Sequence, residues 1–281
     1  MYHFARTFLI STILGVFIAG CDIVEEPYLQ KVGTIKPPPD TGQIVRKVLL
    51  EDFTGHKCPN CPEAAALIHD QLMPVFGEQL IVISVHAGNF AEPSPSGDFT
   101  ADYRTSVGND LNSYFPIPGY PTGMVNRKVY KGNTVLYIGD WQGAIQAQVD
   151  LPVQADIVIT NEYNASTREL TCTLESTFLE NLSGTYNICA FLTESGIISA
   201  QQNESQVDLD YVHNHMLRAS LNGTWGELVG EDGLAVADAV LTDEFSIILN
   251  DGWNAENCSV VAFIYSNDSK EIVQAEEAEI E

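Results

Sequence analysis

The chain has 281 residues, of which 45% are hydrophobic and 18% are charged. This balance excludes a disordered, collagen-like or small disulfide-knot protein, and the length suits one large domain or two ordinary ones. Thirteen Lys and Arg residues against 38 Asp and Glu residues give a formal net charge of −25. That charge argues against a nucleic-acid binder, which needs clustered basic residues, and makes anionic lipid headgroups poor partners.

Residues 1–20 are predicted to be a signal peptide. They carry one cation, Arg6, and an apolar run over residues 8–19 that is too short to span a bilayer. The run ends in Ile-Ala-Gly-Cys21, which resembles the lipobox of bacterial lipoproteins. The resemblance implies that Cys21 is acylated and becomes the first mature residue, so that lipid holds the protein to a membrane. An ordinary secretory signal cleaved near Gly20 and an uncleaved anchor are the alternatives.

Residues 21–43 are polar and contain Pro37-Pro38-Pro39, which predicts an extended tether. The apolar run 47–53 then predicts a buried strand, and residues 54–57 a short loop. Apolar residues recur at helical spacing from Ala64 to Met73, so we expect a helix from about Cys58 to about Pro74. A second buried strand is predicted over residues 80–86.

Cys58 and Cys61 form a CxxC pair at the start of this predicted helix. The helix dipole and the unpaired N–H groups there stabilise a thiolate, and the cation Lys57, together with a protonated His56, would favour it further. Cys61 would then attack a mixed disulfide on Cys58 and release the partner, which is thiol–disulfide exchange. Two alternatives remain open: a static structural disulfide, and half of a zinc site, although the sequence has no second CxxC or nearby CxxH.

The segment EDFTGHKCPNC resembles the strand, loop and dithiol of the thioredoxin superfamily. The resemblance includes an acidic residue six positions before the first cysteine, Asp52, and implies that Asp52 is the buried proton acceptor for Cys61. The neighbouring Glu51 points to the other face of the strand, and we interpret it as a solvated charge.

The segment Gly119-Tyr120-Pro121-Thr122 resembles the thioredoxin loop whose cis-proline faces the dithiol. The resemblance implies a cis Pro121 and a substrate chain held along Tyr120 and Thr122. A plain turn is the alternative, because Pro116 and Pro118 are close by.

The remaining elements complete the first domain. We expect a Pro/Ser/Gly-rich loop over residues 92–97, a helix over 98–114, a hairpin of 123–130 with 134–137, and a helix over 139–149. An insertion of this kind near a site can select partners. The fold class predicted for residues 44–151 is therefore an α/β thioredoxin-like domain.

Residues 152–281 are predicted to be an all-β, sandwich-like domain. Short strands alternate with turn signals, and six of them are expected, over residues 153–160, 168–178, 184–194, 197–201, 245–249 and 258–267. Cys172, Cys189 and Cys258 lie in apolar strands. Three cysteines cannot all pair, so at least one is a buried thiol, and a Cys172–Cys189 bridge remains open.

The segment DLDYVHNHMLR, residues 208–218, is the most chemically suggestive stretch of this second half. His213 and His215 would share a face of a strand and could bind a metal with Asp208 or Asp210. A polar strand or loop that packs against its neighbours is the preferred interpretation. We therefore expect no metal and no cofactor.

The mature chain as a whole resembles the outer-membrane lipoproteins related to the 28-kilodalton outer membrane protein. The motifs that carry this resemblance are the lipobox at Cys21, FTGHKCPNCP, GYPTGMVNR, YVHNHMLR and VVAFIYSND. It implies a thioredoxin-like domain joined to a C-terminal β domain in a Gram-negative outer membrane, where some relatives have been proposed as adhesins. A Pro-Asn pair between the cysteines and the lack of Trp before Cys58 depart from an ordinary thioredoxin.

Two functional hypotheses follow. In the first, the protein is a lipid-anchored enzyme that exchanges thiols and disulfides with envelope proteins, through Cys58, Cys61, Asp52 and Pro121. In the second, it is a surface binding or adhesion module for an unidentified ligand, and the Cys58–Cys61 bridge is only structural.

Overall fold

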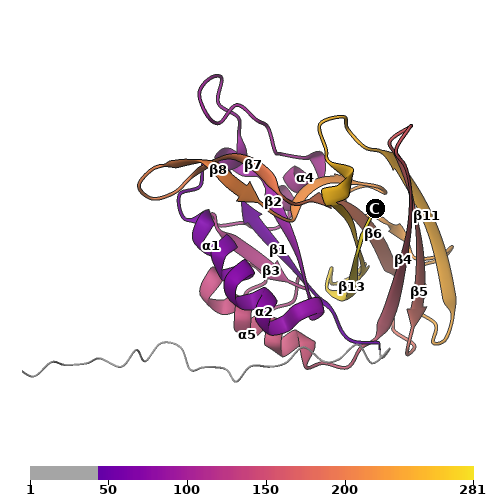
Figure 1. Cartoon of the computed structure of the whole chain (residues 1–281). Coiled ribbons are helices and arrows are strands. Elements are labelled where there is room, and N and C mark those ends of the chain that lie inside the picture. The colour runs from indigo at the N-terminus through magenta and orange to yellow at the C-terminus, as the bar shows by residue number, and fades with distance from the viewer. Residues whose placement is uncertain (1–43) are drawn as a thin grey trace, which may run out of the picture. The chain divides into compact units, whose positions relative to one another are not determined.

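The computed structural model describes residues 44–281. The predicted signal peptide, the lipidated Cys21 and the tether over residues 21–43 lie outside the described residues. The described chain is a mixed α/β protein with more strand than helix (Figure 1). None of its helices is long and apolar enough to cross a membrane.

The first half of the described chain builds one end of a large sheet and the helices beside it. Strand β1 runs parallel to β2 and antiparallel to β3. The elements, in chain order, are β1 (Val48–Thr54), α1 (Cys61–Leu67), the π-helical turn η1 (Ile68–Leu72), α2 (Met73–Phe76), the 3-10 turn η2 (Gly77–Gln79), β2 (Leu80–His86), α3 (Gly88–Ala91), α4 (Ser106–Tyr114), β3 (Thr122–Val125) and α5 (Ile138–Val149).

The second half continues the same sheet. Its elements are β4 (Ala155–Asn164), β5 (Glu169–Phe178), β6 (Tyr186–Glu194), β7 (Ile197–Gln202), β8 (Val207–His213), β9 (Met216–Ser220), β10 (Glu227–Leu228), β11 (Val240–Ile248), the 3-10 turn η3 (Ala255–Asn257), β12 (Cys258–Ser266) and β13 (Ile272–Glu279). The eight-stranded sheet has the order β13-β12-β6-β9-β2-β1-β3, with β10 paired to β6. Strand β9 is therefore the joint, because Met216 pairs with Ser84 of β2. Backbone pairing crosses the domain boundary predicted between residues 151 and 152.

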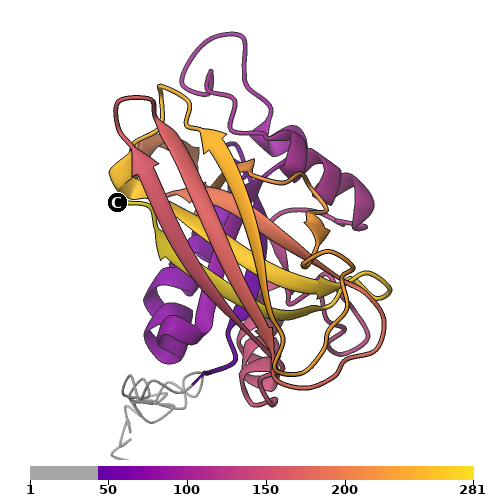
Figure 2. The same ribbon diagram turned by 90° about the vertical axis from the view of Figure 1, so that its right-hand side faces the viewer.

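A separate three-stranded sheet, β11-β5-β4, packs on the large sheet (Figure 2). Apolar side chains alternate along β5, at Leu170, Cys172 and Leu174, and meet those of β6 and β12 in one buried cluster. This alternation is what the sequence predicted for an inward-facing strand. Strands β7 and β8 form a hairpin of their own that lies beside the amino-terminal end of α1 (Figure 1).

Two further cores lie on opposite faces of β1 and β2. On one face, Val48 and Leu50 pack with α1 and α5. On the other, Leu49 and Phe53 pack with α4 and with the inner residues of β6 and β12. The large sheet therefore bends around this second core, and its far strand β13 returns to the start of β1, where the Lys47 N–H donates to the Gln274 side chain at 3.0 Å.

Glu51 is not a solvated charge, which corrects the sequence prediction. Its side chain is 1% exposed and accepts two hydrogen bonds from Arg127, at 2.9 and 2.7 Å. The Arg127 guanidinium also lies over the rings of Phe115, Phe263 and Tyr265, 5.1–5.5 Å from their centroids. Glu51 does point to the face opposite Asp52, as expected, but that face is covered by the bent sheet.

The first helix differs from its prediction at both ends. It begins at Cys61, so Cys58 lies in the preceding turn, and it continues to Phe76 beyond Pro74. Proline lacks an N–H and normally ends a helix. Here the π-helical turn η1 precedes it, with the Met73 N–H bonded to the Ile68 carbonyl, and the helix resumes with Pro74 in the first turn of α2.

The helix expected over residues 98–114 is shorter than predicted. Within this range only α4 (Ser106–Tyr114) is helical, because Thr105 caps its amino-terminal end. The Thr105 hydroxyl accepts a hydrogen bond from the Gly108 N–H at 2.9 Å. The strand over residues 80–86 and the helix over 139–149 are confirmed, the latter extended by one residue to Ile138.

Cys172, Cys189 and Cys258 are buried thiols, and none forms a disulfide with any cysteine of residues 44–281. Cys172 belongs to the core between the two sheets, whereas Cys189 faces the core of the bent sheet. Because Cys172 comes from the three-stranded sheet and Cys189 points away from it, into the core on the other side of the large sheet, the bridge left open by the sequence is not formed. Burial raises the pKa of each thiol to about 12.

Candidate functional site

A polar corner forms where β1 and β2 end, on the face that carries α1. Along this face β1 reads Val48, Leu50, Asp52, Thr54, and in parallel register β2 reads Leu80, Val82, Ser84, His86. Residues two apart on a strand share a face, so both strands change from apolar to polar at the same level. The amino-terminal end of α1, with Cys61, lies over this level and lines a cavity together with Asp52 and His86.

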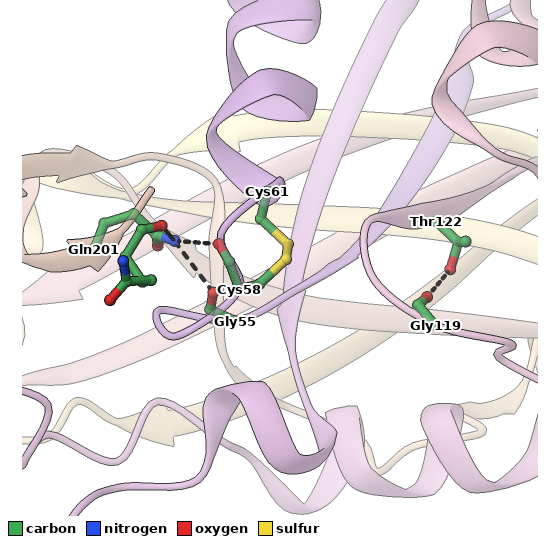
Figure 3. Close-up of a disulfide and its surroundings, with 7 residues drawn as sticks. Gly55, Cys58, Cys61, Gly119, Thr122 and Gln201 are labelled. Atoms are coloured by element: carbon green, nitrogen blue, oxygen red, sulfur yellow. Dashed lines mark hydrogen bonds between the residues drawn. A yellow bond between two sulfur atoms is a disulfide. The ribbon is translucent and has the colours of Figure 1, made fainter. Parts of the chain in front are cut away.

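Cys58, in the turn between β1 and α1, forms a disulfide with Cys61, the first residue of α1 (Figure 3). The Cys58 N–H donates to the Gly55 carbonyl at 2.9 Å, which closes the turn. Gly55 packs directly on the backbone of α3: a Cβ at this position would lie 2.5 Å from the Phe90 carbonyl carbon. Because backbone atoms cannot yield as a flexible side chain does, the loop requires glycine at this position.

Both cysteines are covered, Cys58 to 1% exposure and Cys61 to 3%. Part of the cover comes from the β7–β8 hairpin. The buried Gln201 side-chain amide donates to the Cys58 carbonyl at 2.9 Å and to the Gly55 carbonyl at 3.4 Å (Figure 3), and the Gln202 N–H donates to the His56 carbonyl at 2.8 Å. The hairpin is thus hydrogen-bonded to the loop that carries the dithiol.

Asp52 is buried beside Cys61. Burial raises the pKa of this carboxyl from 3.8 to about 7, and its Oδ1 has no hydrogen-bond partner within residues 44–281. Asp52 and Cys61 line one small cavity of about 30 Å³, together with Thr54, Ala65, Ser84, His86, Gln201, Tyr211, His213 and Asn214. That volume holds a water molecule. The arrangement can move a proton between the carboxyl and the Cys61 sulfur.

The Tyr120–Pro121 peptide bond is cis, as the sequence predicted. Pairing of Phe53 with Thr122 places this loop next to the end of β1, just before the loop that carries Cys58. The Thr122 side chain is buried, and its hydroxyl donates to the Gly119 carbonyl at 2.8 Å (Figure 3). The half-buried Tyr120 hydroxyl donates to the Asn112 side chain.

His56, His213 and His215 are the three histidines that the sequence singled out. Burial lowers the pKa of His56 to about 4, so this side chain is neutral at pH 7 and adds no positive charge beside Cys58. His213 ends β8, whereas His215 follows at a positive φ of 55° and does not share its face. In the described part of the chain, no group of three or more His, Cys, Asp and Glu side chains is placed to hold a metal ion.

Gln201, Tyr211 and His213 are among the site residues that the sequence did not assign to the dithiol. They follow Cys58 by more than 140 positions and reach it only because the β7–β8 hairpin folds back over α1. The sequence offered one signal for Tyr211 and His213, the polar and titratable side chains of residues 208–218, but that signal did not indicate which residues they contact.

The family described as "Outer membrane protein Omp28" matches residues 108–281 of the chain. The chain belongs to the Omp28 family. The Omp28 match begins inside α4, so it includes Pro121 and the β7–β8 hairpin but not Asp52, Cys58 or Cys61. A comparison with curated proteins finds no match.

Among solved structures, the chain is similar to HBP35 of Porphyromonas gingivalis, with a TM-score of 0.66 and 20% identity over 85% of this chain and 76% of that one. This likeness supports the fold alone. A domain of the outer membrane lipoprotein Omp28 from Porphyromonas gingivalis aligns at 25% identity and a TM-score of 0.30, over 47% of this chain and 92% of that domain.

Proposed function

We propose that this Omp28-family protein is a thiol–disulfide exchange protein of the bacterial envelope, with a thioredoxin-like unit over residues 44–151 and a β domain over residues 152–281. The observation that carries the proposal is the Cys58–Cys61 disulfide with the buried Asp52 carboxyl next to it. A structural disulfide does not need a buried, unpartnered carboxyl, which costs stability when ionised. A disulfide that opens needs a proton for the sulfur that leaves.

Exchange proceeds by two successive displacements at sulfur. A thiolate of a substrate dithiol attacks the Cys58 sulfur, the Cys58–Cys61 bond breaks, and Cys61 leaves with the electron pair. Asp52 gives its proton to Cys61. The second substrate thiol gives its proton to water and attacks the substrate sulfur of the mixed disulfide, and Cys58 leaves with the electron pair and takes up a proton from water. The substrate becomes a disulfide, the protein becomes a dithiol, and the reverse sequence oxidises the protein.

The loop at Tyr120, Pro121 and Thr122 is the proposed contact for the substrate chain. Its backbone lies beside the end of β1, next to the loop that carries Cys58. An extended peptide would bind along it by main-chain hydrogen bonds, with envelope protein thiols or disulfides as the partners.

The proposed location is the outer membrane, with the chain attached by lipid on Cys21. The family's description as an outer membrane protein supports the membrane, and the lipobox sequence supports the lipid. Mass spectrometry of the mature protein tests for acyl chains on Cys21. The Cys21→Ser variant should lose both the acyl chains and the membrane association.

The reduction potential of the Cys58/Cys61 pair tests the redox proposal. The full chain is equilibrated in glutathione buffers, and the thiols are trapped by alkylation. A reversible pair between about −120 and −270 mV would support exchange, whereas a potential below about −300 mV or no exchange would refute it. In cells, Cys61→Ala should accumulate mixed disulfides on Cys58, and the Cys58→Ser/Cys61→Ala double variant should show none.

Burial of the disulfide favours a second candidate function. With Cys58 1% exposed under the hairpin, the bridge could serve only to hold the loop, and the protein would then be a surface binding or adhesion module. The family match over residues 108–281 agrees with a function that does not involve the dithiol. In that case Cys58→Ser leaves ligand binding intact.

A further inference from the structure

Two buried histidines lie beside the dithiol without an assigned role. His86 ends β2 and His213 ends β8, each is 4% exposed, and their ring centroids are 5.5 Å apart. Tyr103 lies against both rings, at 5.7 Å from His86 and 5.8 Å from His213. Among residues 44–281, neither ring nitrogen of His86 nor Nε2 of His213 has a hydrogen-bond partner. Buried polar atoms are normally paired, so these three nitrogens need an explanation.

The cavity beside Asp52 and Cys61 has room for a hydrogen-bond partner of these nitrogens. Both histidines line it, and it has room for water, which can bridge ring nitrogens to the Asp52 carboxyl. A larger groove of about 350 Å³ adjoins it between α1 and β8. The two share Ala65, Ser84, Tyr211 and Asn214 as walls. The groove and the small cavity therefore lie next to each other along α1.

We propose that His86 and His213 form a proton relay that connects Asp52 with water in the groove between α1 and β8. This inference rests on the proposed exchange function and concerns the same site. When Asp52 gives its proton to Cys61, a carboxylate remains in a buried cavity, and such a charge is costly until it is neutralised. A neutral imidazole releases a proton from one ring nitrogen and accepts another on the second. The pair thus restores the Asp52 proton and receives one from water.

Burial keeps both rings neutral at rest. Burial lowers the pKa of His213 to about 4 and holds the pKa of His86 well below its usual value, and the neighbouring histidines act in the same direction. The titratable and charged groups that face the pair are Asp52, His56, Tyr103, Tyr211 and Arg218. Of these, only Asp52 would carry a negative charge after the exchange step at neutral pH.

The test is the rate at which dithiothreitol reduces the disulfide of the full chain, measured from pH 5 to pH 9 by alkylation. His213→Gln keeps the size and polarity of the side chain but removes the titratable ring. We expect reduction at pH 7–8 to slow at least about tenfold in His213→Gln and in His86→Gln, since positioned proton transfer contributes more than this in enzymes. The exposed Glu162 of β4, substituted as Glu162→Gln, is the control: it removes a titratable group that lines neither cavity and should change nothing.

A second background separates a relay from a structural role. The Asp52→Asn variant lacks the proton donor, so adding His213→Gln to it should not slow the reduction further. If His213→Gln slows reduction equally in the wild type and in Asp52→Asn, the relay is overturned. Rates equal to wild type across the pH range would also overturn it, while leaving the exchange function in place. A wild-type protein that dithiothreitol cannot reduce in its folded state would instead refute the exchange function, and the relay with it. Should His213→Gln fail to fold, His86→Gln provides the same comparisons.

Discussion

Removing the side-chain amide of Gln201 is expected to expose the disulfide more often. Its Nε2 donates at 2.9 Å to the Cys58 carbonyl and at 3.4 Å to the Gly55 carbonyl, both across the contact between hairpin and loop. Leaving such buried acceptors unpaired costs about 1–3 kcal/mol. We expect that the hairpin must move away from the loop before a reductant reaches Cys58. A factor of ten in population corresponds to about 1.4 kcal/mol, so Gln201→Ala should raise the population of the open state about 5- to 150-fold.

The assay is the rate of native-state reduction by dithiothreitol at fixed pH, read by alkylation and mass. When opening is fast compared with chemistry, this rate follows the open population. Gln202→Ala is the matched control, because the Gln202 side chain donates only to Asn203 and Gln206 within the hairpin turn. An unchanged rate in Gln201→Ala, or the same increase in Gln202→Ala, would refute the hairpin as the barrier to reduction.

Two predictions concern stability. Burial raises the pKa of Asp52 to about 7, so between its usual value of 3.8 and 7 the native state holds a proton that the unfolded state releases. The Asp52 carboxyl alone should remove up to about 4 kcal/mol of unfolding free energy as pH rises through this range. In urea titrations at pH 5 and pH 8, the unfolding free energy of the wild type should therefore fall relative to that of Asp52→Asn, and an unchanged difference between the two proteins would contradict the buried carboxyl. Arg127→Met leaves Glu51 buried without its partner and should cost about 3–5 kcal/mol. Adding Glu51→Gln should recover part of it, and no recovery would argue against the pair.

The elements that the sequence predicted well are those whose signal is local. The apolar run Leu80–His86 becomes β2 with those bounds, because a strand buried on both faces reads as continuous hydrophobic residues. The amphipathic stretch around Trp141 becomes α5. The start of α4 was also encoded locally, by Thr105 as a capping residue, but the longer helical pattern obscured it.

The parts that failed depend on contacts far away in sequence. Glu51 looked like a surface charge, since its partner Arg127 lies 76 residues away. Strand β7 was predicted over residues 197–201, but its partner β8 was not. Strand β8 shows little burial except at His213, so its alternation carries no clear inward face. Cys58 and Cys61 could be placed from their local CxxC motif. The contact of Gln201 with the Cys58 carbonyl could not be predicted, because the two residues are far apart in sequence.

The core inside the bent sheet ties the two halves of the chain into one cooperative unit. Phe53, from the strand that leads to the dithiol, shares that core with Phe191 and Phe263 from the carboxyl-terminal strands. Neither half can melt without exposing the aromatic side chains of the other, so thermal unfolding should proceed in a single transition. Loss of β12 at the far end of the chain would therefore also affect the dithiol: it would unfold the shared core and expose the disulfide in the same step.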